Sequence, residues 1–203
     1  MTSDPRIFRV IKPEIRILGI DDGKFLPHTK GTVIVVGVVF RGGLWLEGVM
    51  HTTVDIDGSN ATEQLAKMIN SSPHCKQLRL VMLNGITLGG FNLVNIKVLH
   101  LVTSLPILAL TRDKPNLDAI RSALKHLPQM DERWGIVEAA GEIYEIANKG
   151  AHLYMETAGI SLADAKRIVD LASTRSSFPE PLRVAHLVAS GVSNIDEFDL
   201  DKV

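Results

Sequence analysis

Three β-type segments near the N-terminus, with little room for helices between them, constrain the fold more than any other feature of this sequence. Ile15–Asp21 is rich in β-branched residues and leucine, Thr32–Phe40 is an almost unbroken apolar run, and Leu44–Ile56 alternates in part. An unbroken apolar run is typical of a strand that is buried on both faces. Since strands joined by short connections pair antiparallel, we expect a meander of three strands.

After this region the hydrophobic pattern changes to alternating helix and strand. Helices are predicted over 61–72, 91–104 and 116–127, with strands over Leu78–Leu83 and Leu105–Leu110 between them. Two more helices are predicted over Ser161–Ser173 and 179–192. Such alternation predicts parallel strands joined by right-handed crossovers. Three antiparallel strands that lead into parallel βα units are the order of the ribonuclease H-like fold, an α/β class with a mixed sheet flanked by helices.

The composition is typical of one folded domain. The chain has 203 residues, of which 45% are hydrophobic and 22% charged, and its formal net charge is -1. Its only cysteine, Cys75, excludes a disulfide framework and suits a reducing cytoplasm, and its longest apolar run is too short to span a bilayer. We therefore predict a cytoplasmic protein with a single domain over 1–203, a possible added hairpin near 138–160 and a loosely held tail at 193–203.

Polar side chains stand at the ends of the elements that should meet at one edge of the sheet. Asp21 ends the first strand, Asn84 ends the fourth, and Glu63 lies in the first turn of the helix between them. In a mixed sheet of this order the first and fourth strands are neighbours, and α/β sheets place ligands beyond the carboxyl ends of their strands. One or two carboxylates plus substrate phosphates are the usual ligands of Mg²⁺. The pattern predicts a Mg²⁺ site, in which Mn²⁺ could substitute, with Asp21, Glu63 and Asn84 as ligands.

Each of these residues also has a purely structural interpretation. The Asp-Asp-Gly sequence that begins at Asp21 favours a turn, and Glu63 would stabilise its helix through the helix dipole. Asn84-Gly85 is a common turn dipeptide. The three positions are therefore more informative together than singly.

Basic residues gather in the second half of the chain. Arg112 directly follows a predicted strand at the site edge, so it is the best candidate for binding a phosphate, with Lys114 close behind it. Other basic residues of this half, among them Arg133, would mostly lie on solvated faces where they fall on helices. Because the net charge is close to zero, contact with nucleic acid is expected to be transient.

The segments "RILGIDDG", "DIDGSNATEQLAKMI", "LNGITLGGFNLVNI" and "PEPLRVAHLVAS" resemble an archaeal family of unknown function catalogued as endonuclease dU, a distant relative of endonuclease V. The resemblance to the archaeal family covers nearly the whole chain. Endonuclease V has a ribonuclease H-like fold and uses Mg²⁺ to cut DNA or RNA near deaminated bases, chiefly inosine. The resemblance thus implies a Mg²⁺-dependent endonuclease. Its partner would be nucleic acid, DNA in preference to RNA, that contains uracil or inosine.

The resemblance also implies roles for individual residues. By position, catalytic roles fall on Asp21, Glu63, Asn84, Arg112 and His186. Contacts with nucleic acid fall on Arg112, Lys114, Arg183 and the backbone at Gly85.

The chain departs from the family pattern at three amides. The family usually has aspartate at the positions of Asn60, Asn84 and Asn95, and an amide oxygen coordinates a hard cation only as a neutral ligand. The aromatic segment with which endonuclease V probes the damaged base is replaced here by the sequence Val-Asp-Ile-Asp at 54–57. The alternative function is a nucleic-acid-binding or interaction protein on the same fold, with a metal site weakened or inactivated by Asn84.

Overall fold

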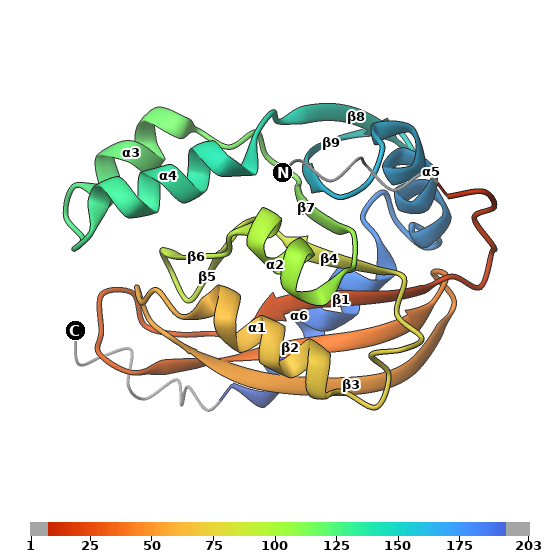
Figure 1. Cartoon of the computed structure of the whole chain (residues 1–203), viewed down its shortest axis with the longest axis horizontal. Helices are drawn as coiled ribbons and strands as arrows, with labels where there is room; N and C mark the ends of the chain where they lie inside the picture. Colours follow the sequence, from red (N-terminus) through yellow and green to blue (C-terminus); the bar gives the residue numbers. More distant parts are fainter. Residues whose placement is uncertain (1–7, 194–203) are drawn as a thin grey trace.

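The computed structural model describes residues 8–193 and contains a seven-stranded mixed sheet with helices on both faces (Figure 1). The strand order is β3-β2-β1-β4-β7-β9-β8. The seven strands are β1 (Arg16–Asp22), β2 (Thr32–Arg41), β3 (Trp45–Asp55), β4 (Leu80–Asn84), β7 (Ile107–Thr111), β8 (Tyr144–Asn148) and β9 (Ala151–Ala158). A small second sheet pairs β5 (Thr87–Leu88) with β6 (Asn92–Leu93). The helices are α1 (Ala61–Ser71), α2 (Ile96–Thr103), α3 (Leu117–Leu124), α4 (Met130–Ala140), α5 (Leu162–Ala172) and α6 (Glu180–Val192).

The strand pairing confirms the predicted mixed α/β sheet. β1, β2 and β3 form an antiparallel meander, whereas β4 runs parallel to β1 and β7 runs parallel to β4. The crossovers from β3 to β4 and from β4 to β7 contain α1 and α2, which lie in front of the sheet in Figure 1. The carboxyl ends of β1, β4 and β7 therefore meet at one edge, as the sequence predicts.

The sheet separates two apolar layers. On one face, Leu18 and Ile20 of β1 pack with buried residues of α1, α2 and α4. On the other face, Ile17 packs with residues of α5 and with Leu182 of α6, and α6 continues over β2, where Ala185 lies among buried valines. Because successive strand residues point to opposite faces, the two aspartates that end β1 must also point to different layers.

The predicted helix over 91–104 begins later than expected. Its first residues form β6, which pairs with β5 across a turn at Gly89 and Gly90, and both glycines have positive φ angles (54° and 86°). Asn95 then caps α2 by accepting a hydrogen bond from the backbone N–H of Val98 at 3.1 Å. The glycine-rich segment is thus a hairpin, and the helical pattern was extended too far toward it.

The predicted hairpin near 138–160 is present as β8 and β9. It is not an appendage, because β9 pairs antiparallel with β7 and so extends the main sheet. The residues of the predicted tail at 194–203 lie outside the described part of the chain. Ser193 itself is held, because its hydroxyl accepts from the backbone N–H of Lys24 and donates to the carbonyl of Ala189.

Arg133 is an exception to the expectation that most of the basic residues in this half are solvated. Its side chain is buried and donates hydrogen bonds to the backbone carbonyls of Asp57, Gly58, Phe91 and Pro128. A guanidinium has five N–H donors and no acceptor, so it can tie several chain segments together. Arg133 of α4 thereby fixes the hairpin β5–β6 against the end of β3. Within residues 8–193, no helix is long and apolar enough to cross a membrane.

Candidate active site

Asp21 and Asn84 lie side by side at the carboxyl edge of the sheet. The parallel register of β1 and β4 pairs Ile20 with Leu83, so the next residue of each strand is brought to the same place. The amide nitrogen of Asn84 donates to Oδ2 of Asp21 at 3.2 Å. The structure therefore brings together two of the three predicted metal ligands.

His186 joins this pair from the far end of the chain. α6 packs closely over β1, which is possible because Gly19 has no side chain. A Cβ added at Gly19 would lie 2.3 Å from the backbone of Pro181. One and a half turns further along α6, Nδ1 of His186 lies 2.9 Å from Oδ2 of Asp21. The Asp21 side chain is 4% exposed and that of His186 is 61% exposed, so the imidazole connects a buried carboxylate to solvent.

Burial dominates the electrostatics of Asp21. It raises the pKa of this carboxyl, although hydrogen bonds from Asn84 and from the backbone of Asp22 and the nearby His186 all oppose the shift. A raised pKa means that the negative charge is only partly compensated by the groups around it. Such a carboxylate gains from any cation that reaches it.

The side chain of Asp22 lies on the face of the sheet opposite to that of Asp21. Its Oδ2 accepts a hydrogen bond from the backbone N–H of Gly89 at 2.6 Å, so it anchors the tip of the hairpin β5–β6. Burial raises the pKa of Asp22 to about 6; the Gly89 bond lowers it and the negative charge of Asp21 raises it. The sequence singled out Asp21 and the glycines, but it gave no sign that the second aspartate binds the glycine turn.

Glu63 does not reach this cluster. It lies on the exposed side of α1, where its carboxylate is 2.6 Å from the amine of Lys67 and 66% exposed. The structure gives Glu63 no contact with Asp21, Asn84 or His186. Its predicted role as a metal ligand would require the ion pair with Lys67 to open, and it stays a prediction.

The predicted phosphate-binding residues surround the edge without touching Asp21. Arg112 is exposed and stacks over the ring of Phe178, 4.1 Å from its centroid, and Lys114 is exposed in the following loop. Gly85 has a φ of 75° and donates its N–H to the carbonyl of Leu110, so it turns the chain sharply after Asn84.

A buried ion pair in the first turn of α6 was not predicted. Glu180 is 2% exposed, and its Oε2 accepts from Nη2 and Nε of Arg183 at 2.6 and 3.0 Å. Its other oxygen, Oε1, is buried without a hydrogen-bond partner among the described residues. The sequence pattern "PEPLR" shows an acidic residue in a first helical turn, which usually indicates only a helix dipole effect.

Oxygen donors at this edge are few. No group of three His, Cys, Asp or Glu side chains in residues 8–193 is arranged to hold a metal ion. Asp21 supplies one undercompensated carboxylate, and Asn84 can supply one amide oxygen. This donor set fits a single hard cation whose remaining ligands are water and a substrate phosphate, and it lacks the carboxylates for a pair of ions.

Comparison with known proteins decides the family. The endonuclease dU family matches residues 13–193. The chain belongs to that family. A relative from Methanothermobacter thermautotrophicus, named only "UPF0215 protein", is 50% identical over 187 residues, which is 92% of this chain and 91% of the relative. Another, from Methanopyrus kandleri, is 42% identical and covers 91% and 94% of the two chains.

Solved structures extend the similarity to the fold. A protein of unknown function from Archaeoglobus fulgidus has a TM-score of 0.80 and 38% identity, and the match covers 89% of this chain and 99% of that one. Endonuclease V from Bacillus subtilis has a TM-score of 0.55 and 10% identity, with 91% and 84% covered. Endonuclease V from Ciona intestinalis, bound to a 24mer DNA that contains an inosine, has a TM-score of 0.53 and 13% identity, with 93% and 87% covered. The endonuclease dU family thus shares the fold of endonuclease V.

Proposed function

We propose that this protein is an endonuclease with Mg²⁺ as its cofactor. Its proposed substrate is nucleic acid, DNA in preference to RNA, that contains uracil or inosine, and it hydrolyses phosphodiester bonds. The observation that carries the proposal is the buried Asp21 carboxylate, which contacts Asn84 and His186 at the edge where β1 and β4 end. The description of the family and the inosine-containing complex of the endonuclease V relative support the substrate class.

In this proposal Asp21 and Asn84 hold the cation. A bound Mg²⁺ supplies Lewis-acid chemistry, which polarises a phosphoryl oxygen and lowers the pKa of water. Asp21, whose charge the described residues leave undercompensated, would hold the cation through its carboxylate. Asn84 contributes a neutral ligand, so binding is weak until a substrate phosphate adds its own oxygens.

His186 is proposed as the group that exchanges protons with the attacking water. When Asp21 is ionised, Nδ1 of the imidazole donates to Oδ2, which fixes the ring and directs Nε2 away from the carboxylate. Because the His186 side chain is 61% exposed, water and substrate can reach it. Asp21 is thus proposed both to hold a cation and to orient a base.

The basic residues around the edge are proposed to bind the backbone of the substrate. Arg112 can donate in a bidentate manner to a phosphate from its position over Phe178. Lys114 would add charge, whereas Arg183, whose charge is compensated by Glu180, would contribute only N–H donors. The turn at Gly85 would let backbone approach the strand closely. Because these contacts are few, the affinity should be modest and should fall only gradually with salt.

The test is cleavage of oligonucleotides that contain uracil, inosine or only normal bases, with Mg²⁺ or Mn²⁺. Asp21→Asn should abolish cleavage, because it removes the charge that holds the cation and orients His186. Asp164→Asn is the matched control: Asp164 is also buried, but it lies at the start of α5, where it accepts from the backbone N–H of Phe8. Cleavage by Asp21→Asn at the wild-type rate would refute the assignment.

One observation favours a second function, that of a nucleic-acid-binding protein with a weakened site. Asn84 presents its amide nitrogen to Asp21, whereas ligation of a cation requires the amide oxygen. On this alternative, wild-type protein binds the same oligonucleotides without cutting them in either metal, and Asp21→Asn binds equally well.

A further inference from the structure

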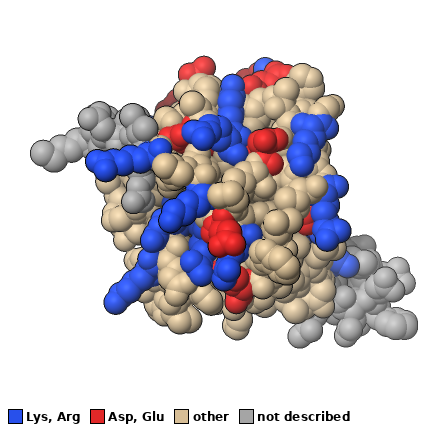
Figure 2. Space-filling view, turned by 90° about the vertical axis from the view of Figure 1, so that its right-hand side faces the viewer, with Lys and Arg blue, Asp and Glu red and all other residues tan. Residues whose placement is uncertain are grey.

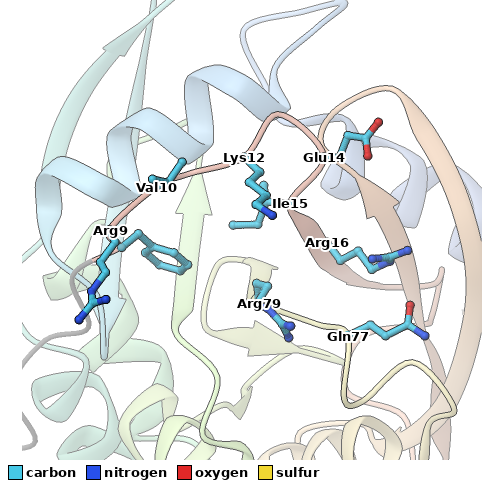
Figure 3. Close-up of a pocket in the computed structure, with 9 residues that line it drawn as sticks. Arg9, Val10, Lys12, Glu14, Ile15, Arg16, Gln77 and Arg79 are labelled. Atoms are coloured by element: carbon cyan, nitrogen blue, oxygen red, sulfur yellow. The ribbon is translucent and has the colours of Figure 1, made fainter.

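A cavity of about 440 Å³ lies at the edge of the sheet opposite to Asp21, where β1 and β4 begin. Residues 8–15, which precede β1, form one wall, and the loop before β4 forms the other (Figure 3). The lining includes Phe8, Arg9, Lys12, Ile15, Arg16 and Arg79. Since β1 has seven residues, this cavity lies about 20 Å from the candidate active site, and it is large enough for a small ligand.

The cavity is strongly basic although the whole chain carries a net charge of -1. Four cations line it against a single carboxylate, that of Glu14. Figure 3 shows Glu14 pointing away from Lys12 and Arg79, and its nearest cation is Arg41, outside the cavity, at 3.9 Å. Figure 2, which faces this side of the molecule, shows many Lys and Arg side chains on it, with some Asp and Glu side chains among them. The cavity therefore offers positive charge that no lining acid neutralises.

Two of the four cations are held in place by the fold. Arg79 donates from Nη1 to the backbone carbonyls of Lys76 and Leu78 at 3.0 and 2.8 Å, which fixes its guanidinium but leaves its charge uncompensated. Nε of Arg16 lies 2.7 Å from Oε2 of Glu47, so its charge is compensated. Arg79 is thus a rigid cation in the wall, and Arg16 is a structural one.

The other two cations are unengaged. The side chains of Arg9 and Lys12 make no hydrogen bond or ion pair with any other residue in 8–193, and both are exposed. In Figure 3 the Lys12 side chain lies next to Ile15, and Arg79 lies below both residues. Ile15 is 6% exposed and Phe8 is partly buried, so the floor of the cavity is apolar. Two uncompensated cations, Lys12 and Arg79, beside an apolar, partly aromatic surface suit a ligand with an anionic and a planar apolar part.

We propose that this cavity binds the phosphate of a nucleoside monophosphate, either free or at the 5′ end of a strand. A terminal phosphate carries up to two negative charges, which match the pair Arg79 and Lys12 better than the single charge of an internal phosphodiester. Figure 3 shows Arg9 directed away from this pair, so Arg9 adds positive charge to the wall without contacting the same phosphate. The base would pack over Phe8 and Ile15, where aromatic stacking adds affinity without requiring a particular base. This site is separate from Asp21 and does not depend on the nuclease proposal.

The test is titration calorimetry of the full chain with AMP, with adenosine as the ligand that lacks the phosphate. AMP should bind and adenosine should not. Lys12→Glu, which reverses an exposed charge, should weaken AMP binding about 10-fold to 100-fold, as expected for a lost charged hydrogen bond plus repulsion. Lys97→Ala on α2 is the control, since it removes one exposed positive charge elsewhere, and Asp21→Asn should bind AMP as wild type does.

A second arm distinguishes the two sources of the phosphate. An oligonucleotide with a 5′-phosphate is compared with the same strand ending in a 5′-hydroxyl, in wild type and in Lys12→Glu. A preference for the 5′-phosphate that Lys12→Glu abolishes supports the site as one for strand ends, and binding of AMP alone supports a free nucleotide. If neither probe shows binding that depends on its phosphate, or if Lys12→Glu changes neither, the proposal is refuted.

Discussion

Replacing Asn84 by aspartate should convert a weak cation site into a strong one. The new carboxylate would stand next to Oδ2 of Asp21, which now lies 3.2 Å from the Asn84 amide nitrogen. Two negative charges at that separation repel by about 5 kcal/mol at an effective dielectric constant of about 20. Without metal the pair should retain a proton, because burial already raises the pKa of Asp21 and a second negative charge beside it raises that pKa further. With Mg²⁺ or Mn²⁺ the cation replaces the proton and the repulsion disappears.

The expected result is a gain in metal affinity of at least about tenfold, because part of this repulsion is relieved only when the cation binds. A metal concentration about 100 times the dissociation constant stabilises the folded state by about 2.7 kcal/mol, which for a chain of this size raises Tm by about 5–10 °C. Calorimetric titration with Mn²⁺ and thermal unfolding with EDTA or Mg²⁺ measure the two effects. Cleavage of the uracil and inosine oligonucleotides should increase in parallel.

Asn84→Ala separates charge from contact, because it loses the hydrogen bond to Asp21 without adding a carboxylate. It should show no gain in metal affinity. If Asn84→Asp binds Mn²⁺ no better than Asn84→Ala, and its Tm does not respond to metal, then Asn84 does not lie where a cation binds and the placement of the site is wrong.

Two further variants test the surroundings of the site. The pKa of Asp22 is raised from 3.8 to about 6 in the folded protein. Asp22 therefore loses its proton at lower pH in the unfolded chain than in the folded one. The free energy of unfolding should fall by up to about 3 kcal/mol as pH rises from about 4 to about 6. Asp22→Asn keeps an oxygen that can accept from the Gly89 N–H, and urea unfolding between about pH 4 and about pH 6 should show that its stability no longer falls. The control, Asp118→Asn, changes an exposed aspartate and should behave as wild type does. If the stability of Asp22→Asn falls with pH in parallel with wild type, the prediction is wrong. Glu180→Gln should cost about 1–2 kcal/mol, because the buried partner of half-exposed Arg183 is lost. Glu138→Gln is its control, because Glu138 is an exposed helical glutamate that accepts a hydrogen bond from Nε1 of Trp134. An equal effect in both variants would show that burial of Glu180 is unimportant.

The sequence predicted the central strands of the sheet well because they are buried on both faces. β1, β2, β4 and β7 appear as apolar runs that end at polar residues, and their order predicted which strands are neighbours. It missed α4 and merged β6 with α2. The hairpin β5–β6 is only two residues long on each side and depends on Asp22, Asp57 and Arg133 from elsewhere in the chain, so no local pattern records it.

The candidate site was predictable where it depends on strand register. Asp21 and Asn84 end adjacent parallel strands, and periodicity alone places them together. The contact with His186 came from the resemblance, since nothing in the local pattern of α6 indicates which strand it covers. Glu63 shows the limit of such transfer: its position in the first turn of α1 is as predicted, but its side chain pairs with Lys67 instead. Side-chain direction depends on packing that a strand order does not specify.

The docking of α6 has a consequence for the timing of folding. Asp21 and His186 are separated by 165 positions, and α6 also covers Val36, Val38 and Phe40 of β2. During synthesis the sheet can form while this apolar strip is still open, but the imidazole arrives only when the last helix has left the ribosome and packed across β1. A growing or C-terminally shortened chain would therefore hold a bare carboxylate beside an exposed hydrophobic surface, a state that chaperones and proteases recognise. Completion of the cluster of Asp21, Asn84 and His186 and burial of that surface are one and the same event.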